Sequence, residues 1–467
     1  MINRRIAATS RRQMLRSVAA AATFGPLFKL TEGTVSAQAR SRPPNKLSAP
    51  SDLKITDIRG CTIEGPYDYP TIRIDTNQGV YGLGELFCLQ LISEALLLKP
   101  FLVGKNPLEI PGILQSIRRF AFQSQSGGYS AIDIALHDIA GKVYGVPAWR
   151  LIGDKVRDRV LLYCDTMGVR DPKLYGSQMK RRQEMGFQYF KMDLDRWLVS
   201  DKPGATGPEG ALTDRGLKYI CELVQAVKDA IGWSAPLSAD THGGGRASTV
   251  TASIRFARAV EPFNMWFLQD LIAATDWRRW KQITDSTTTP TLTGESLFGL
   301  PEGYKNLIDN HAVGLIHPDV TAVGGMLEVK KVADYAALNG MSTVVHCANG
   351  PVAQMANAHL AATLTNFQAL EHHGVDIPWF DSLVTGVRKP IIERDGYQTV
   401  PDTPGLGVEL NEVAVKEHLR HPGYAVPDGY FEPTPMYDKA MLGGHPRGPW
   451  PHLDPSGKLV NAMEDEQ

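Results

Sequence analysis

Cysteine is scarce in this sequence and is never paired at short spacing. The 467 residues include five cysteines. An odd number without a Cys-x-x-Cys spacing indicates neither a disulfide framework nor a thiolate zinc site. We interpret them as mostly buried core thiols: Cys61, Cys88, Cys164, Cys221 and Cys347.

Excess charge and long apolar runs are also lacking. The formal net charge is -1 and no long basic run occurs, so nothing indicates a nucleic acid or an anionic membrane as partner. The apolar stretch from Val18 to Leu30 is too short and too interrupted to span a membrane stably. No Gly-x-Gly-x-x-Gly turn follows a first strand, which argues against dinucleotide binding. Small-molecule chemistry is therefore the expected function.

The N-terminal residues have the order of an export signal. Arg11 and Arg12 lie in the segment Ser10–Arg16, the apolar stretch follows, and Ala37-Gln38-Ala39 offers a small-residue cleavage site. This order resembles a twin-arginine signal peptide, which implies delivery of the folded protein to the periplasm. The alternative is a disordered basic tail. We expect a signal peptide over residues 1–39 and a polar linker over 40–52.

Residues 53–155 are predicted to form a small α+β domain. Strand-like runs over 55–58, 71–74 and 80–85 are separated by turn signals such as Asp75–Gly79, which indicates an antiparallel meander. Apolar residues at three- and four-residue steps then predict helices over 91–102, 108–121 and 131–144. Gly145 and Pro147 end the last of these helices.

From about Val160, short apolar runs that end in polar residues alternate with helical stretches. Eight strands are predicted, over 160–164, 189–193, 237–240, 266–270, 290–293, 313–319, 343–346 and 367–371. From Asp240 onward the polar ends recur every ~24 to 29 residues, the length of one strand-helix unit in a (β/α) barrel. A doubly wound open sheet shares this alternation and is the competing fold. We expect the barrel over 156–390, and a C-terminal segment over 391–467 that returns to the first domain and then extends.

Polar residues close the predicted strands, and in a barrel these strand ends meet on one face. Each has an ordinary interpretation alone, since a strand-end aspartate often caps a helix. Their recurrence over consecutive units instead predicts one active site. The residues expected there are Lys191, Asp193, Asp240, His242, Gln269, Asp270, Glu295, Asp319, His346 and Glu371.

Three neighbouring strand ends offer oxygen ligands: Asp240, Gln269-Asp270 and Glu295. Mg²⁺ prefers such ligands, and no thiolate is placed to attract zinc. A zinc hydrolase that uses His242 and His346 is disfavoured, because the sequence has neither a His-x-His nor a His-Glu-x-x-His pair.

These strand ends, with His317-Pro318-Asp319 and Gly324-Gly325, resemble the enolase superfamily in its mandelate racemase branch. Gly82-Leu83-Gly84-Glu85, the predicted helix 131–144 and Pro404–Glu409 are also similar to that family. The resemblance implies an α/β fold, a modified (β/α)₇β TIM barrel with an α+β N-terminal capping domain, and a homo-oligomer. The family's common step removes the proton α to a carboxylate that binds Mg²⁺, and an enediolate forms.

The resemblance also implies the metal ligands. Asp240, Gln269 and Glu295 would hold Mg²⁺, but the family usually has glutamate where Gln269 stands. An amide oxygen can bind Mg²⁺ with one negative charge fewer, so we expect weaker binding. Asp270 would replace Gln269 only if the strand end shifted by one residue, because adjacent strand residues point to opposite faces.

Further roles follow from the same resemblance. Lys191 would stabilise the enediolate by its positive charge. Asp319 and His346 match a dyad in which the carboxylate orients the imidazole, and His346 is the general base. Glu371 matches an acid that hydrogen-bonds the substrate carboxylate, and His317 is also assigned to substrate binding.

Asp193 and His242 favour loss of water over racemisation. The family's racemases carry a second lysine where Asp193 stands, and a racemase needs bases on both faces of the carbon. Asp240-Thr241-His242-Gly243 and His346–Pro351 resemble segments of gluconate- and galactonate-type acid sugar dehydratases. We predict such a carbon-oxygen lyase, which forms a 2-keto-3-deoxy acid, with His242 as the general acid.

Two alternatives stay open. A racemase, epimerase or cycloisomerase of the same superfamily would use His242 or Asp193 as its second acid or base. A non-catalytic periplasmic protein would bind a sugar acid without turnover, which the Gln269 change allows. The sequence does not identify the sugar acid, and it predicts no function for the Pro- and Gly-rich tail over 423–467.

Overall fold

The computed structural model describes residues 52–88, 90–121, 126–208, 210–243, 249–420, 452–453 and 459–460. The predicted signal peptide lies outside the described residues, as do the linker apart from Asp52 and most of the C-terminal tail. None of the described helices has the length and apolar composition of a membrane span.

The N-terminal sheet is the predicted antiparallel meander, with β1 (Ile55–Ile63), β2 (Tyr69–Thr76) and β3 (Tyr81–Glu85) in that order. The expected helix over 91–102 is instead two short helices, α1 (Ile92–Leu96) and α2 (Lys99–Leu102). Pro100 explains the break, because its ring removes an N–H and clashes with the preceding turn. The other helices are α3 (Ile110–Ala121) and α4 (Tyr129–Tyr144).

Helix α4 packs against β3 with almost no space between the two backbones. A Cβ atom added at Gly84 would lie 2.0 Å from the carbonyl oxygen of Ala131, and one at Gly82 would lie 2.1 Å from that of Ala135. Glycine at these two positions therefore allows the helix to lie directly on the sheet. The other side of α4 faces α10 (Gly325–Leu338), and Asp133 of α4 accepts a hydrogen bond of 2.6 Å from the Met326 N–H of α10.

The second region is a closed parallel barrel. Its strands are β4 (Arg159–Cys164), β5 (Tyr189–Asp193), β6 (Leu237–Asp240), β7 (Leu268–Gln269), β8 (Thr291–Thr293), β9 (Leu315–Ile316), β10 (Ser342–Val345) and β11 (Phe367–His372). They pair in sequence order and β11 pairs back with β4, which confirms the predicted barrel and excludes the open doubly wound sheet.

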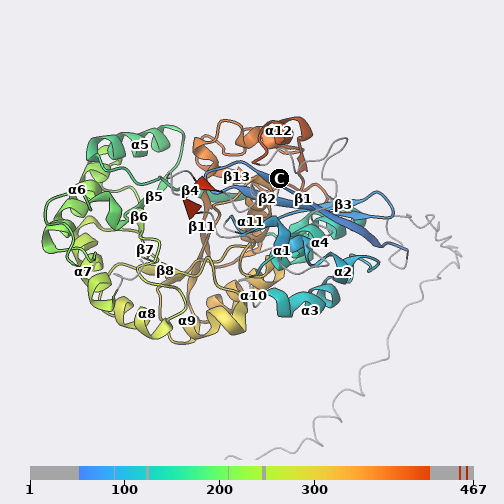
Figure 1. Ribbon diagram of the computed structural model, residues 1–467, viewed down its shortest axis with the longest axis horizontal. Coiled ribbons are helices and arrows are strands. Elements are labelled where there is room, and N and C mark those ends of the chain that lie inside the picture. Colours follow the sequence, from blue (N-terminus) through green and yellow to red (C-terminus); the bar gives the residue numbers. More distant parts are fainter. Residues whose placement is uncertain are drawn as a thin grey trace, which may run out of the picture. The chain divides into compact units, whose positions relative to one another are not determined.

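One helix follows each of the first seven strands, as the (β/α)₇β form requires. They are α5 (Pro172–Glu184), α6 (Asp214–Ile231), α7 (Val250–Val260), α8 (Trp277–Thr284), α9 (Lys305–Asp309), α10 (Gly325–Leu338) and α11 (Pro351–Thr363). In Figure 1, α5 to α9 form an outer layer around strands β4 to β8.

Apolar side chains fill the barrel immediately below the predicted site. This layer comprises Tyr163, Phe267, Leu292, Leu315, Val344 and Ala369. Most of these residues precede a polar strand-end residue by two positions, as Val344 precedes His346 and Ala369 precedes Glu371. Side chains two positions apart in a strand lie on the same face of that strand. The polar strand-end residues therefore point into the barrel mouth, directly above the apolar layer.

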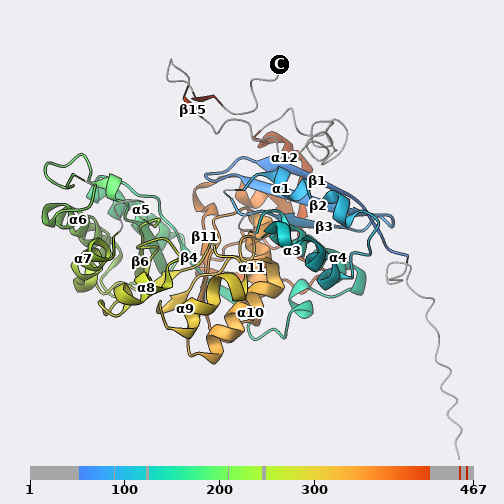
Figure 2. The ribbon, with the colours of Figure 1, turned by 60° about the horizontal axis from the view of Figure 1, so that its bottom comes forward.

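The C-terminal segment forms β12 (Val384–Thr385), β13 (Tyr397–Thr399), β14 (Glu409–Leu410) and α12 (Glu412–Glu417), and β15 (His452–Leu453) pairs with β16 (Leu459–Val460). Leu419 bridges to Ile63 of β1, and the Leu406 N–H donates to Asp138 of α4 at 2.8 Å. Figure 2 shows α12 beside β1 and β2. The C-terminal segment and the N-terminal domain, which flank the barrel in the sequence, therefore contact one another. The predicted domain limits stay a prediction.

Candidate active site

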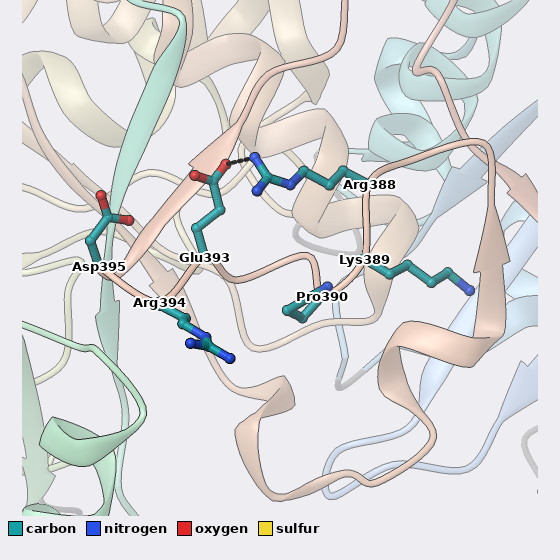
Figure 3. A pocket seen from close by; sticks show the side chains of 6 residues that line it. All are labelled: Arg388, Lys389, Pro390, Glu393, Arg394 and Asp395. Carbon is teal, nitrogen blue, oxygen red and sulfur yellow. Dashed lines mark ion pairs between the residues drawn. The ribbon is translucent and has the colours of Figure 1, made fainter.

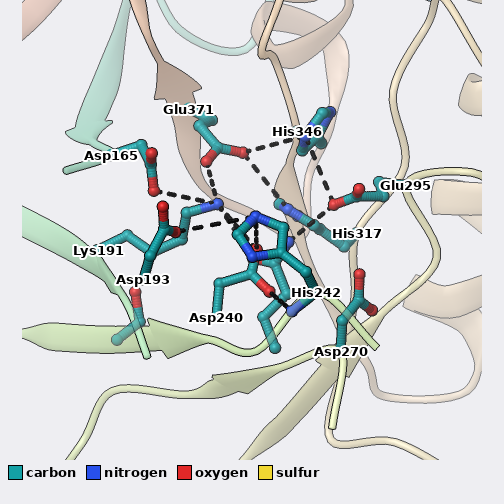
Figure 4. Close-up of polar contacts among 12 residues, drawn as sticks. Asp165, Lys191, Asp193, Asp240, His242, Asp270, Glu295, His317, His346 and Glu371 are labelled. Atoms are coloured by element: carbon teal, nitrogen blue, oxygen red, sulfur yellow. Dashed lines mark hydrogen bonds and ion pairs between the residues drawn. The ribbon is translucent and has the colours of Figure 1, made fainter. Parts of the chain in front are cut away.

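Lys191 lies at the centre of a cluster of strand-end side chains (Figure 4). Its ammonium forms an ion pair with Glu371, and its Nζ lies 3.3 Å from Asp240 Oδ2 and 3.4 Å from Asp165 Oδ1. Burial opposes the charge, but the three carboxylates hold the pKa of Lys191 well above its usual value. Lys191 is therefore a fixed buried cation at the barrel mouth.

Asp319 and His346 form the predicted dyad. His346 Nδ1 lies 2.7 Å from Asp319 Oδ2, and Asp319 Oδ1 accepts hydrogen bonds from the backbone and hydroxyl of Thr321 at 2.8 and 2.7 Å. The other ring nitrogen, Nε2, lies 3.5 Å from Glu295 Oε2 and 3.7 Å from Glu371 Oε2. The carboxylate thus fixes the ring so that Nε2 points to the centre of the site.

The charges around His346 determine its protonation. Burial lowers its pKa, but the carboxylates of Glu295 and Glu371 and the hydrogen bond to Asp319 outweigh burial and raise the pKa to about 10. Without a cation beside these carboxylates, the imidazole is protonated at neutral pH. A positive charge at Glu295 would favour the neutral ring that a general base needs.

His242 reaches the site from a strained turn after β6. Its φ is 48°, in the left-handed region that non-glycine residues rarely adopt, and its N–H donates to Asp240 Oδ1 at 2.8 Å. Its Nε2 lies 3.9 Å from both Asp193 Oδ1 and Asp240 Oδ2. Burial lowers the pKa of His242, but the hydrogen bond to Asp195 and the charge of Asp240 raise it to about 11. The ring therefore carries a proton available for donation.

Asp240, Gln269 and Glu295 lie at the ends of three neighbouring strands, as predicted. Gln269 is completely buried, and its Nε2 donates to Glu295 Oε2 at 2.7 Å while its Oε1 lies 3.4 Å from Lys191 Nζ. Rotation of the amide would present its oxygen beside the two carboxylates. One amide oxygen and two carboxylates are hard donors, so this set fits Mg²⁺.

Asp270 is separated from that ligand set by its backbone. Its φ is 47°, so the extended alternation ends here, and its Oδ1 accepts a hydrogen bond from the Thr293 hydroxyl. Burial and the charges of Glu295 and Asp240 raise the pKa of Asp270 well above its usual value. A carboxyl group with a raised pKa is a poorer cation ligand than Asp240, whose pKa is lowered.

Glu371 is enclosed by cationic and imidazole groups. In addition to Lys191, it contacts His373 Nε2 at 3.1 Å through Oε1, and His317 Nε2 at 3.5 Å through Oε2. Burial raises the pKa of Glu371, but these neighbours hold it well below its usual value. His317 is fully buried and its Nδ1 lies 2.9 Å from the Val344 carbonyl oxygen, so it supports Glu371 from below.

Sequence reasoning missed Asp165, Asp195 and His373. Asp165 directly follows β4, so the strand-end rule that found the other residues would have found it too. His373 Nδ1 lies 3.6 Å from Asp165 Oδ2, which joins the first and last strands of the barrel. Asp195 lies in the loop after β5 and had no comparable signal.

The N-terminal domain covers one side of this cluster. The Phe87 ring lies 5.8 Å from that of His346, and the Tyr67 ring lies 5.7 Å from that of His373. Phe87, Cys88, Ala322 and Ala348 form a small buried apolar cluster against which Tyr67 packs. The loop between β1 and β2 and the residues after β3 therefore border the barrel mouth.

A separate hollow of about 470 Å³ is lined by Arg388, Lys389, Pro390, Glu393, Arg394 and Asp395 (Figure 3). Glu393 lies 2.6 Å from Arg159, the first residue of β4. This hollow is therefore at the N-terminal end of the barrel strands, the opposite end from the strand-end cluster.

Comparisons with known proteins agree with this geometry. Residues 175–414 match the family model described as enolase C-terminal domain-like, and residues 60–153 match the mandelate racemase/muconate lactonizing enzyme N-terminal domain. A D-xylonate dehydratase from Haloferax volcanii is 33% identical over 79% of this chain and 89% of its own length. A D-galactonate dehydratase family member from Pantoea ananatis is 31% identical over 78% and 93%.

Solved structures show the same relationship. A mandelate racemase/muconate lactonizing enzyme-like protein from Rubrobacter xylanophilus is 28% identical, with a TM-score of 0.73 over 80% of this chain and 98% of its own. An enolase from Pantoea ananatis with bound D-gluconate and Mg is also 28% identical, with a TM-score of 0.67 over 78% and 94%. The chain belongs to the enolase superfamily, in its mandelate racemase/muconate lactonizing enzyme group.

Proposed function

We propose that the protein is a Mg²⁺-dependent dehydratase of a sugar acid. The observation that carries this proposal is the placement of His242 and His346 on opposite sides of the barrel mouth. They follow β6 and β10, which are four strands apart in a closed barrel of eight. One imidazole can then accept the proton at C2 while the other donates a proton to the hydroxyl at C3.

The relatives support the same substrate class. Two are named for dehydration of D-xylonate and of D-galactonate, and one solved neighbour holds D-gluconate and Mg. All three molecules are carboxylates with hydroxyls at C2 and C3. The cluster around Lys191 provides the charge that such a substrate needs.

The chain's residues divide the reaction between them. Asp240, Glu295 and the Gln269 amide oxygen would hold Mg²⁺, which supplies positive charge to the substrate carboxylate when bound. Lys191 stabilises the enediolate, and Glu371 fixes Lys191. His346 Nε2 accepts the C2 proton while Asp319 holds the ring. His242 then protonates the C3 hydroxyl, which leaves as water, and the enol tautomerises to a 2-keto-3-deoxy acid.

A screen of acid sugars with Mg²⁺, run in D₂O, tests this function. We expect a 2-keto product from at least one acid. His346→Asn should abolish both exchange of the C2 proton and product formation, and His242→Asn should lower product formation by about 10²- to 10⁴-fold while exchange continues. Exchange without keto acid in the wild type would identify a racemase or epimerase, and affinity with neither reaction would identify a non-catalytic binding protein.

We also propose that the protein acts in the periplasm. The arginine pair, apolar stretch and small-residue site of residues 1–39 support export of a folded chain. Export after folding suits a site whose metal is bound in the cytoplasm.

A further inference from the structure

We infer that Asp195 and Trp197 position the general acid His242, and that the site therefore has two carboxylate-imidazole dyads instead of one. This inference rests on the proposed function, because it assigns His242 to departure of the C3 hydroxyl. It concerns two residues of the loop after β5 that lie outside the strand ends.

The contacts of Asp195 are directed at the imidazole. Both of its carboxylate oxygens lie within hydrogen-bond distance of His242 Nδ1, Oδ1 at 3.2 Å and Oδ2 at 3.1 Å. Asp195 precedes the short 3₁₀ helix Arg196–Leu198, yet its side chain makes no capping hydrogen bond to that helix. Asp195 therefore does not cap this helix with its side chain, although aspartate often does so at the residue before a helix.

Trp197 holds the carboxylate in place. Its indole Nε1–H donates to Asp195 Oδ2 at 3.3 Å, and the Arg170 guanidinium lies 5.3 Å from the centroid of its ring. Arg170 is fixed in turn by Asp201 at 2.9 Å. Although Trp197 is partly exposed, its contacts with Arg170 and Asp195 hold the Asp195 carboxylate beside His242.

The geometry repeats that of the Asp319–His346 dyad. Asp319 binds Nδ1 of His346 and leaves Nε2 facing the site, and Asp195 binds Nδ1 of His242 and leaves Nε2 facing Asp193 and Asp240. The His242 side chain is 45% exposed, so packing alone does not fix its ring. The hydrogen bond from Nδ1 therefore sets which nitrogen meets the leaving hydroxyl.

A comparison of two leaving groups tests this role. The first probes are D-xylonate and 3-deoxy-3-fluoro-D-xylonate, or the matching pair for whichever sugar acid the wild type dehydrates. Loss of water from C3 needs a proton from His242, whereas the C3–F bond breaks to give fluoride ion without one. Removal of the C2 proton by His346 is common to both substrates.

We expect Asp195→Ala to lower kcat for the hydroxy acid by about 10- to 100-fold and to leave kcat for the fluoro acid within about threefold of the wild type. Asp195→Asn keeps an acceptor for Nδ1–H and should recover most of the loss. Trp197→Phe should give a smaller loss of the same kind, because it removes the N–H and keeps the ring.

Trp233 and Asp229 provide matched controls. Trp233 is as exposed as Trp197, at 48%, and its Nε1–H donates to Asp229 Oδ1 at 3.1 Å, away from the strand-end cluster. Trp233→Phe and Asp229→Ala should leave both rates unchanged. Equal losses for the two leaving groups in Asp195→Ala, or no loss for either, would overturn the inference.

A readout that does not depend on turnover separates this inference from the proposed function. The ¹⁵N resonances of His242, assigned by their absence in His242→Gln, should shift at Nδ1 in Asp195→Ala and stay unchanged in Asp229→Ala. A wild type that turns over no acid sugar would reject the function alone, whereas an unshifted Nδ1 would reject the inference.

Discussion

Gln269 gives the proposed metal site one negative charge fewer than three carboxylates would. Its amide nitrogen also donates a hydrogen bond to Glu295. A glutamate in place of Gln269 would instead repel the Glu295 carboxylate when no metal is bound. The amide therefore stabilises the metal-free protein and weakens the attraction for a divalent cation.

Gln269→Glu should reverse both effects. We expect Mg²⁺ to bind about tenfold more tightly, which corresponds to about 1.4 kcal/mol, and we expect the variant to unfold at a lower temperature than the wild type in EDTA. Calorimetric titration with MgCl₂ and thermal unfolding with and without EDTA measure these changes. Gln115→Glu adds the same charge at an exposed position of α3 and should not change the Mg²⁺ affinity. Unchanged Mg²⁺ affinity in Gln269→Glu would contradict the ligand assignment.

At the scale of elements, the contact between α4 and β3 joins the helix of the N-terminal domain to its sheet. Gly84→Ala would place a methyl group 2.0 Å from the Ala131 carbonyl oxygen, so the two backbones must separate. Overpacking of this kind costs about 1 to 3 kcal/mol. We expect a loss of at least that size in the free energy of unfolding, measured by urea denaturation.

Gly112→Ala is the control for Gly84→Ala. Gly112 lies on the exposed face of α3 with nothing within 4 Å of an added Cβ, so alanine should stabilise that helix by about 0.5 to 1 kcal/mol. Equal effects of the two substitutions would show that close approach does not explain Gly84.

His359 of α11 joins three elements through a neutral imidazole. Its Nδ1 accepts from the Trp149 N–H at 3.3 Å, and its Nε2 lies 3.0 Å from the Leu406 carbonyl oxygen, so a proton on Nδ1 would face a donor. Burial lowers the pKa of His359 from 6.5 to about 4. Above pH 6.5 the ring is neutral in the folded and unfolded states, and its contribution to stability is fully present.

Stability should therefore fall as the pH decreases from 6.5 to 4, because the unfolded chain binds a proton that the folded chain rejects. The expected loss between pH 7 and pH 5 is about 2 kcal/mol. Urea unfolding of the wild type and of His359→Gln at both pH values isolates the contribution of His359 to this loss of stability. The exposed variant His311→Gln should follow the wild type, and an identical pH dependence in His359→Gln would contradict the assignment.

At the scale of the whole molecule, cap and barrel share the site, because Tyr67 and Phe87 contact imidazoles that follow barrel strands. Substrate specificity is thus expected to depend on both regions. The family resemblance also implies a homo-oligomer, which sedimentation of the purified protein would test.

Export is predicted to depend on the arginine pair. Replacement of Arg11 and Arg12 by lysine keeps the charge and removes the twin-arginine pattern, so we expect the protein to stay in the cytoplasm with its fold unchanged. Cell fractionation with an antibody measures the distribution. Periplasmic accumulation of the double variant would contradict the predicted route, and Lys29→Arg, which also exchanges one basic residue for another, should not alter export.

Much of the site was predictable because hydrophobic alternation is local. The runs before Lys191, Asp240, His346 and Glu371 show where parallel strands end, and all such ends meet on one barrel face. Two of the predicted strands, over 266–270 and 313–319, are much shorter in the structure, with two residues each. Asp270 and Asp319 therefore belong to loops, since pairing stops where the backbone turns, as at Asp270.

The sequence by itself determined the alternation of strands and helices and the polar residues at the strand ends, because buried strands must repeat an apolar pattern and end in polar residues. The dyad of Asp319 and His346 came from the resemblance to the enolase superfamily, and strand pairing decided between a closed barrel and an open sheet. Only the tertiary structure decided which groups pair across the barrel mouth. Asp195 meets His242, and Asp165 meets His373, because of barrel closure, the path of one loop and a left-handed backbone at His242. Both pairings depend on contacts between residues far apart in the chain, and the local periodicity of the sequence does not predict such contacts.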